Sequence, residues 1–353
     1  MSHRRIFTVL IFAAITASLA HAQSALLDLP RKSQDAQVTQ TIGVTNITVK
    51  YSRPLVNGRK VWGGLVPYGE VWRAGANENT TITFTTPVTV EGKPLNAGTY
   101  GLFMIPKEDE WTVIFSKTNS AWGAFSYKPD EDALRVTVKP ALSDFHDALL
   151  YDFDQLQPDS ALVSLRWDKL AVPFKVAVNV PQTVEASLQK QFRGIVQYTW
   201  QSYDDAANYF LDAKVDLPVG LQYADKSIDQ EERYDNLMTK ARILQAMGKN
   251  DEAKPLIAQA LAKADAPQMY TYARQLQRDH KQDDAFAVYR TLAQKYPTHW
   301  ITYAGDARLA VGAGNYDEAL KQMKLCLANA PEAQKAGVQT LIKRLEQREN
   351  INQ

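Results

Sequence analysis

The spacing of apolar residues changes once along the chain, near Pro181. Before this point apolar and polar residues alternate with a period of two, as at Leu134, Val136 and Val138, which is typical of strands with one buried face. After it the period is 3.6, which indicates amphipathic helices. A chain of 353 residues is long enough for two domains with separate cores. The sequence therefore predicts a β domain followed by an α domain.

The β half contains about eight short apolar-polar segments between residues 38 and 179, and no helical pattern separates them. The expected strands lie at 47–51, 81–90, 99–105, 111–115, 134–138, 151–153, 163–167 and 172–178. Short strands with one polar side are typical of an antiparallel β-sandwich. The polar segment Asp144-Phe145-His146-Asp147 is expected to be a loop between two of them, which disfavours a catalytic triad built on His146.

One turn motif recurs three times in the α half and ends each time on an alanine. A second alanine stands twelve positions before each of these, and prolines stand twelve positions after the last two. The alanines are Ala241, Ala253, Ala273, Ala285, Ala307 and Ala319, and the prolines are Pro297 and Pro331. In each motif a glycine or histidine is expected to turn the chain, and an aspartate or asparagine to cap the second helix.

These positions resemble the tetratricopeptide repeat over about residues 230–331, because the motif alanines are spaced 32 and 34 residues apart. We expect a closing helix from 332 to about 348, so that the solenoid domain covers 230–353, and an irregular helical connector or degenerate repeat over 184–229. Three repeats with a terminal cap meet the minimum for a stable solenoid. The resemblance implies a surface for a protein partner, and such repeats rarely catalyse reactions.

The chain begins with a basic head, an apolar run of 14 residues and the triplet Ala20-His21-Ala22. This arrangement predicts a signal peptide over residues 1–22, with cleavage after Ala22 and a β domain over 23–180. The run is shorter than the roughly 20 residues of a membrane-spanning helix, and no later segment is apolar enough to span. The single cysteine, Cys326, leaves no internal disulfide, which favours an exported bacterial protein, periplasmic or secreted.

Several function classes lack support in the composition and motifs. A formal net charge of +1 gives no field for nucleic acid. The nucleotide-binding, serine-hydrolase and zinc-protease motifs do not occur in the sequence. The β half contains one histidine, His146, and no cysteine, which argues against a metal or haem site. We therefore expect no metal and no cofactor.

Five segments of the β half resemble the bacterial domain of unknown function 2911. They are YSRP (51–54), RKVWG (59–63), YGEVWRAGANE (68–78), AGTY (97–100) and WG (122–123). The resemblance covers about residues 37–180. It implies a fold unit of exported bacterial proteins, some of which carry similar helical repeats behind it. It supplies no activity, substrate or catalytic residue.

The same region concentrates the candidate ligand-binding side chains. These are Arg53, Trp62, Glu70, Trp72, Arg73, Asn77, Trp122 and Tyr127. As a ligand site, the tryptophans would stack on a sugar or apolar molecule and the arginines would bind a carboxylate or phosphate. As a structural corner, the tryptophans would pin a long loop, the arginines would pair with Glu70 or Glu78, and asparagines would close turns. Both interpretations stay open.

The sequence as a whole favours a non-enzymatic protein. We expect an exported bacterial binding or scaffold protein whose repeats engage a protein partner, while the β domain offers a docking surface or small-ligand pocket. The alternative is a hydrolase of cell-envelope or polysaccharide material, in which Glu70 is catalytic and Arg53 and Arg73 orient the substrate.

Overall fold

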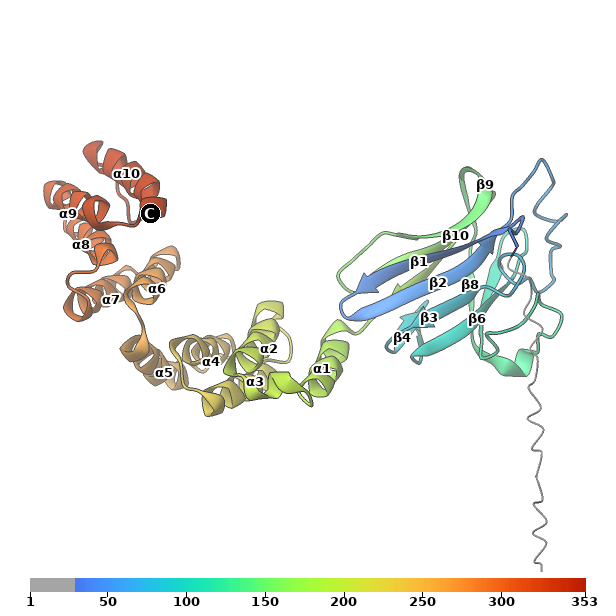
Figure 1. The fold of residues 1–353 in the computed structure, drawn as a ribbon, viewed down its shortest axis with the longest axis horizontal. Coiled ribbons are helices and arrows are strands. Elements are labelled where there is room, and N and C mark those ends of the chain that lie inside the picture. The colour runs from blue at the N-terminus through green and yellow to red at the C-terminus, as the bar shows by residue number, and fades with distance from the viewer. Residues whose placement is uncertain (1–28) are drawn as a thin grey trace, which may run out of the picture. The chain divides into compact units, whose positions relative to one another are not determined.

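The computed structural model describes residues 29–353, which form two compact units that divide between Asn179 and Val180 (Figure 1). The predicted signal peptide at residues 1–22 lies outside this range. Within it, no helix combines the length and apolar character needed to cross a membrane. The predicted fold class is confirmed: antiparallel sheets come first and a solenoid-like array of helices follows.

The N-terminal unit consists of two antiparallel sheets (Figure 1). The six-stranded sheet has the order β1 (Gln34–Ile42), β2 (Thr45–Arg53), β3 (Thr81–Phe84), β6 (Gly98–Ile105), β7 (Trp111–Ser116) and β8 (Asp132–Val138). The four-stranded sheet has the order β5 (Lys93–Leu95), β4 (Val88–Val90), β10 (Ser160–Ala177) and β9 (Ala141–Asp154). Phe115 of the first sheet packs on Phe174 of the second, and both are fully buried, so the core lies between the sheets.

The predicted boundaries of the strands were wrong in two places. The single strand expected at 81–90 is divided at Pro87, where the chain leaves the first sheet as β3 and enters the second as β4. Conversely, the strands expected at 163–167 and 172–178 are one strand, β10. Asp168 has a left-handed backbone there and the pairing with β9 shifts register, which bends the strand without ending it. Pro173 lies between the part paired with β9 and the part paired with β4.

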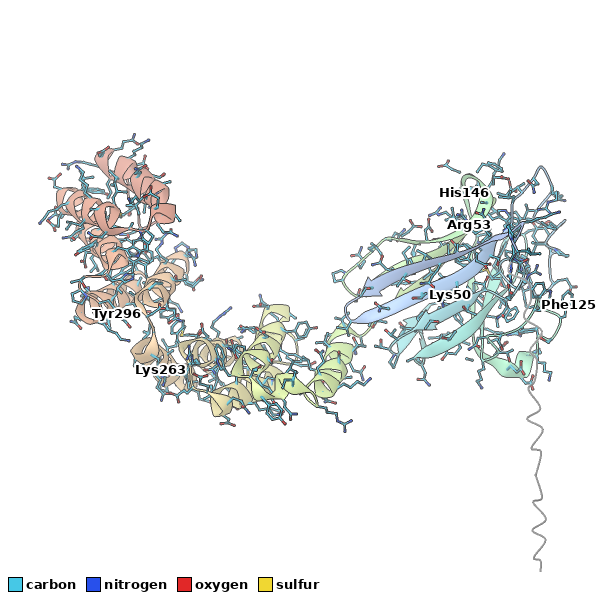
Figure 2. All side chains as sticks on the ribbon, viewed as in Figure 1. Lys50, Arg53, Phe125, His146, Lys263 and Tyr296 are labelled. Atoms are coloured by element: carbon cyan, nitrogen blue, oxygen red, sulfur yellow. The ribbon has the colours of Figure 1, made fainter. Side chains whose placement is uncertain are left out.

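The loop expected at 144–147 is also wrong, because these residues belong to β9, where His146 pairs with Asp168 of β10 (Figure 2). β9 is the edge strand of its sheet. An edge strand tolerates polar side chains on both faces, because one of its sides is open to water. The polar run therefore resembled a loop while forming a strand.

The C-terminal unit is built from antiparallel helix pairs. After α1 (Val180–Gln191) come α2 (Trp200–Ala213) with α3 (Leu217–Gln230), α4 (Tyr234–Ala246) with α5 (Asn250–Lys263), α6 (Ala266–Arg278) with α7 (Gln282–Lys295), α8 (Trp300–Gly312) with α9 (Tyr316–Asn329), and α10 (Glu332–Glu346). All six repeat alanines are fully buried. A methyl group at these positions lets the two helices of a pair approach closely, as expected for the repeat.

The turns between paired helices share one geometry. Gly248, His280 and Gly314 all have left-handed backbones, which lets the chain reverse direction. The predicted capping by aspartate or asparagine holds only for Asn315, whose side chain accepts from the backbone N–H of Glu318 at 3.1 Å. The corresponding cap positions of α5 and α7 are Lys249 and Lys281, which form no side-chain cap, although all three helices begin three residues before the repeat alanine.

Candidate functional site

The motif loop, residues 69–80, lies against two separate parts of the β domain. Near its start, Trp72 exchanges two backbone hydrogen bonds of 2.8 Å with Met104 of β6. Near its end, Glu78 forms an isolated bridge with Trp122. The backbone N–H of Thr80 donates to the carbonyl of Arg73 at 3.2 Å and closes the loop on itself.

Hydrogen bonds satisfy much of the loop interior. Ala74 and Asn77 have left-handed backbones, which non-glycine residues seldom adopt. The carbonyl of Ala74 accepts from the hydroxyls of Thr80 and Tyr151, both at 2.9 Å. The side-chain amide of Asn77 donates to the carbonyl of Ser33 at 3.1 Å. These contacts give the carbonyl of Ala74 and the side chain of Asn77 partners within the β domain.

Trp62 and Trp72 are part of an aromatic cluster with Trp111 and Trp167. The ring of Trp62 lies 5.8 Å from Trp72, 4.9 Å from Trp111 and 5.7 Å from Trp167, in edge-on geometry. Trp62 is only 7% exposed. Trp122 lies outside this cluster and is 59% exposed. Of the loop tryptophans, Trp122 is therefore the one that offers its ring to solvent.

Tyr127 is turned toward the sheet. Its ring packs on Phe103, and its hydroxyl donates to the carboxylate of Asp132 at 2.8 Å. Burial, followed by the hydrogen bond and charge of Asp132, raises the pKa of Tyr127 to about 12. The phenol is therefore neutral and already engaged within the domain.

The two candidate arginines do not pair with the candidate glutamates. Arg53, at the end of β2 (Figure 2), donates through Nε to the carbonyl of Leu149 at 2.8 Å. Arg73 is partly buried, desolvation lowers its pKa, and its Nε has no hydrogen-bond partner within the described part of the chain. Glu78 pairs with Arg31 at 2.7 Å, and Glu70 is exposed. The arginine–glutamate pair of the structural-corner interpretation is therefore not formed, and Glu78 pairs instead with Arg31, which lies outside the motif.

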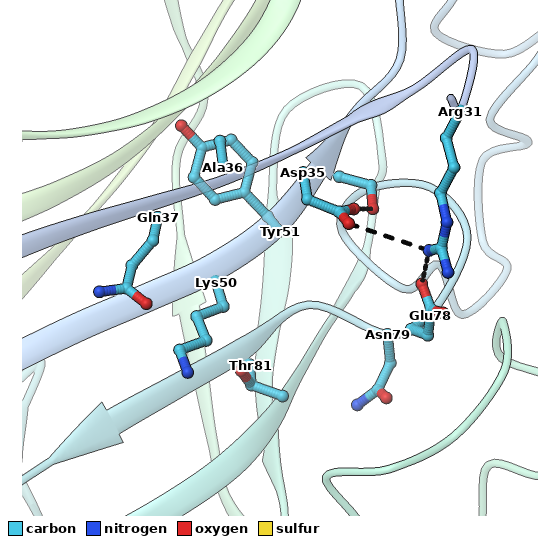
Figure 3. Close-up of a pocket in the computed structure, with 10 residues that line it drawn as sticks. Arg31, Asp35, Ala36, Gln37, Lys50, Tyr51, Glu78, Asn79 and Thr81 are labelled. Carbon is cyan, nitrogen blue, oxygen red and sulfur yellow. Dashed lines mark hydrogen bonds and ion pairs between the residues drawn. The ribbon is translucent and has the colours of Figure 1, made fainter. Parts of the chain in front are cut away.

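A pocket of about 510 Å³ opens beside Glu78 (Figure 3). Arg31 lies between Asp35 and Glu78 there, and the hydrogen bond to Arg31 lowers the pKa of Glu78. Ten residues line this pocket: Arg31, Asp35, Ala36, Gln37, Lys50, Tyr51, Ser52, Glu78, Asn79 and Thr81. Its polar lining suits a small polar ligand. Glu70 and Arg73 are not among the lining residues, so the proposed hydrolase pair gains no pocket here.

Metal ligation has no candidate in this part of the chain. Among residues 29–353, no group of three or more histidine, cysteine, aspartate and glutamate side chains is arranged to hold an ion.

A second pocket, of about 640 Å³, lies on the helical unit. Most of its lining comes from the first helices of successive pairs, α2, α4 and α6. It combines apolar side chains such as Met238 and Ile257 with polar ones such as Asn208, Arg242 and Gln275. Our sequence reasoning missed these residues. They could have been found from the repeat itself, because Met238, Arg242 and Gln245 stand three before, one after and four after the buried Ala241.

Asp204, on α2, is the unusual group of this pocket. It is 8% exposed, and its Oδ1 has no hydrogen-bond partner among the described residues. Its Oδ2 accepts from the side chain of Asn208 at 3.2 Å. Desolvation is the main reason why the pKa of Asp204 is raised, and the charges of Asp235 and Asp205 add to it. A carboxylate is thus held where its charged form is disfavoured.

We expect Asp204→Asn to stabilise the helical unit by on the order of 1 kcal/mol at pH 7, because the buried charge is removed. Since the folded-state pKa lies above the unfolded value, the wild-type penalty is present above the folded pKa and disappears as the pH falls through it. The gain should therefore shrink in acid. Urea unfolding of both chains from pH 7 down to pH 3 measures this. A gain that grows in acid would contradict the assignment.

Comparison with known proteins finds a family match in the β half. Residues 33–176 match the family model described as "Protein of unknown function (DUF2911)". A curated relative, cellulose synthase operon protein C of Pseudomonas fluorescens (strain SBW25), is 30% identical over 130 residues, which cover 36% of this chain. The chain spans only about a tenth of that protein, since the match covers 10% of it.

Among solved structures, YrrB, described as a TPR protein with an unusual peptide-binding site, is 14% identical. The match covers 44% of this chain and 81% of YrrB, with a TM-score of 0.28. The assignment of tetratricopeptide-like repeats to this chain rests on its own helix pairs, buried alanines and left-handed turns.

Proposed function

We propose, for a chain that joins a DUF2911 domain to tetratricopeptide-like repeats, that it is an exported bacterial scaffold protein whose repeats bind a protein partner. The observation that carries the proposal is the pocket lined by α2, α4 and α6. Equivalent helices of consecutive repeats contribute to one continuous surface, which is how solenoids build extended binding sites.

The chemistry of this surface fits a peptide segment of a partner. Arg242 offers donors and Gln275 a donor and an acceptor for backbone groups, while Met238 and Tyr272 offer apolar area for side chains. A pocket with a few polar groups set in an apolar lining gives both orientation and affinity. The β domain adds a second surface, the polar pocket beside Glu78, for docking or for a small ligand.

Site-specific photo-cross-linking tests the proposal. A photoreactive benzoylphenylalanine replaces Gln275, which lines the pocket, or Gln259, a glutamine on α5 that is also exposed and does not line the pocket. In cell-envelope extracts of the bacterium that encodes the protein, Gln275 is expected to give a discrete adduct and Gln259 none. The purified partner, identified by mass spectrometry, should bind more weakly to the Arg242→Glu variant. Equal adducts at both positions, or unchanged binding of that variant, would count against the groove.

Export is part of the same proposal and rests on the basic head, apolar run and Ala20-His21-Ala22 triplet. Protein recovered from outside the cytoplasm should begin at Gln23 when its N-terminus is sequenced. Protein that stays in the cytoplasm with Met1 intact would remove this part of the proposal.

A further inference from the structure

The pocket of about 510 Å³ in the β domain lies on the outer face of the six-stranded sheet. Val49 and Tyr51 are buried, so the alternation of side chains along β2 turns Lys50 to the opposite, exposed face. The register places Gln37 of β1 on one side of Lys50 and Thr81 of β3 on the other. Figure 3 shows the Lys50 side chain extending between the other two. These three side chains form one end of the pocket.

This end of the pocket has unused hydrogen-bonding capacity and a positive charge. The side chains of Gln37, Lys50 and Thr81 form no hydrogen bond, ion pair or ring contact among the residues that the structure describes. A lysine ammonium offers three donors, whereas an amide and a hydroxyl can each donate and accept. An ammonium without a carboxylate partner attracts an anion. This end therefore suits an anionic group that the two polar neighbours can also hydrogen-bond.

The other end of the pocket carries the opposite charge. Arg31 lies 4.0 Å from Asp35 and 2.7 Å from Glu78, so that one guanidinium is shared by two carboxylates and one negative charge is left over. Asp35 also accepts from the hydroxyl of Ser52 at 2.7 Å, which fixes its position. Asp35 is opposite Ser52 in the register, two positions along β2 from Lys50. Such diagonal neighbours on a sheet face are roughly 7–8 Å apart.

We propose, building on the proposed function, that this pocket binds a small zwitterion whose cationic and anionic groups lie several bonds apart. The cationic group of the ligand binds at the carboxylates of Asp35 and Glu78, and its anionic group binds Lys50. A few polar groups at fixed positions orient a small ligand in its pocket. A ligand with only one charge leaves one end of this pocket unpaired, and therefore binds more weakly.

Titrations followed in TROSY spectra of the full chain test the proposal. The ω-amino acid ε-aminohexanoate carries both charges several bonds apart, hexylamine and hexanoate carry one each, and the two charges of glycine are too close together to reach both ends. We expect ε-aminohexanoate to bind about fivefold more tightly than the other three probes, an advantage that falls with salt. It should shift the side-chain amide signals of Gln37 and Asn79, which line the pocket. Equal affinities, or tighter binding of a singly charged probe, would overturn the proposal.

Three variants assign the two charges of the ligand to the two ends of the pocket. Lys50→Gln should remove the advantage of ε-aminohexanoate over hexylamine and keep its advantage over hexanoate, because only the anionic group loses its partner. Glu78→Gln should do the reverse. Lys175→Gln, at an exposed lysine of β10 in the other sheet, is the matched control and should change neither. All three side chains are exposed, so the fold should tolerate the changes, which circular dichroism melts check. Unchanged preferences in Lys50→Gln and Glu78→Gln would place the binding elsewhere and reject the site.

The outcome is separable from that of the proposed function, because the titrations do not involve the repeats. A cross-link at Gln275 without a preference for ε-aminohexanoate rejects only the zwitterion site. A preference for ε-aminohexanoate without any cross-linked partner rejects only the partner of the repeats.

Discussion

Trp62→Ala is expected to lower the free energy of unfolding of the β domain by about 3–5 kcal/mol. The side chain is 7% exposed and contacts three other tryptophans with ring centroids 4.9 to 5.8 Å away. Its removal would leave a cavity that the surrounding rings cannot fill, since Trp111 and Trp167 are themselves fully packed. Hydrogen exchange of β6 and β7 in increasing urea measures the effect on this domain alone.

The matched control is Trp122→Ala, which removes the same side chain from an exposed position. Its effect on stability should stay within about 0.5 kcal/mol. The pair also separates the two roles that the sequence left open, because a ligand that stacks on the loop would lose affinity with Trp122→Ala and leave the stability unchanged. If Trp122→Ala destabilised the domain as much as Trp62→Ala, the aromatic cluster would not be the support of the loop.

Gly101→Ala is expected to destabilise the β domain by about 1–3 kcal/mol. A Cβ atom at this position of β6 would lie 2.2 Å from the carbonyl oxygen of Thr118 and 2.7 Å from the side-chain nitrogen of Asn79. The oxygen belongs to the backbone, so the strand itself must move. The same movement would disturb Asn79, whose Oδ1 accepts from the backbone N–H of Ala121 at 2.8 Å. The urea midpoint and the amide exchange of Ala121 should both report the change.

Gly337→Ala provides the contrasting case, because no atom lies within 4 Å of the added methyl group on α10. Alanine reduces the conformational freedom of the unfolded chain and has a higher helix propensity than glycine. We therefore expect the free energy of unfolding of the helical unit to rise by about 0.5–1 kcal/mol. Equal midpoints for Gly101→Ala and the wild-type chain would show that the backbone at Thr118 yields more easily than the geometry indicates.

The candidate loop shows how far local patterns reach. Its position at a β-sheet corner could be predicted, since left-handed residues act over a few residues. The expected local role of the Asn77 side chain was wrong, because its amide donates to the carbonyl of Ser33, 44 residues away. The partner of Glu78 could not be predicted from the local sequence. Arg31 lies 47 residues away, and its approach depends on the pairing of β1 with β2. The same holds for the buried contacts of Trp62, which join segments from both sheets.

Some features of this protein follow from its sequence alone, and others were decided only by the tertiary structure. The order of the domains, the helical repeat and its six small residues follow from the sequence, because hydrophobic period and side-chain size act between neighbours a few residues apart. The tertiary structure alone decided that Pro87 divides a strand between two sheets, that Glu78 pairs with Arg31, and that Arg308 holds Ile351, which is 43 residues away. These contacts depend on which distant segments pack together, and a period of two or 3.6 carries no information about that choice.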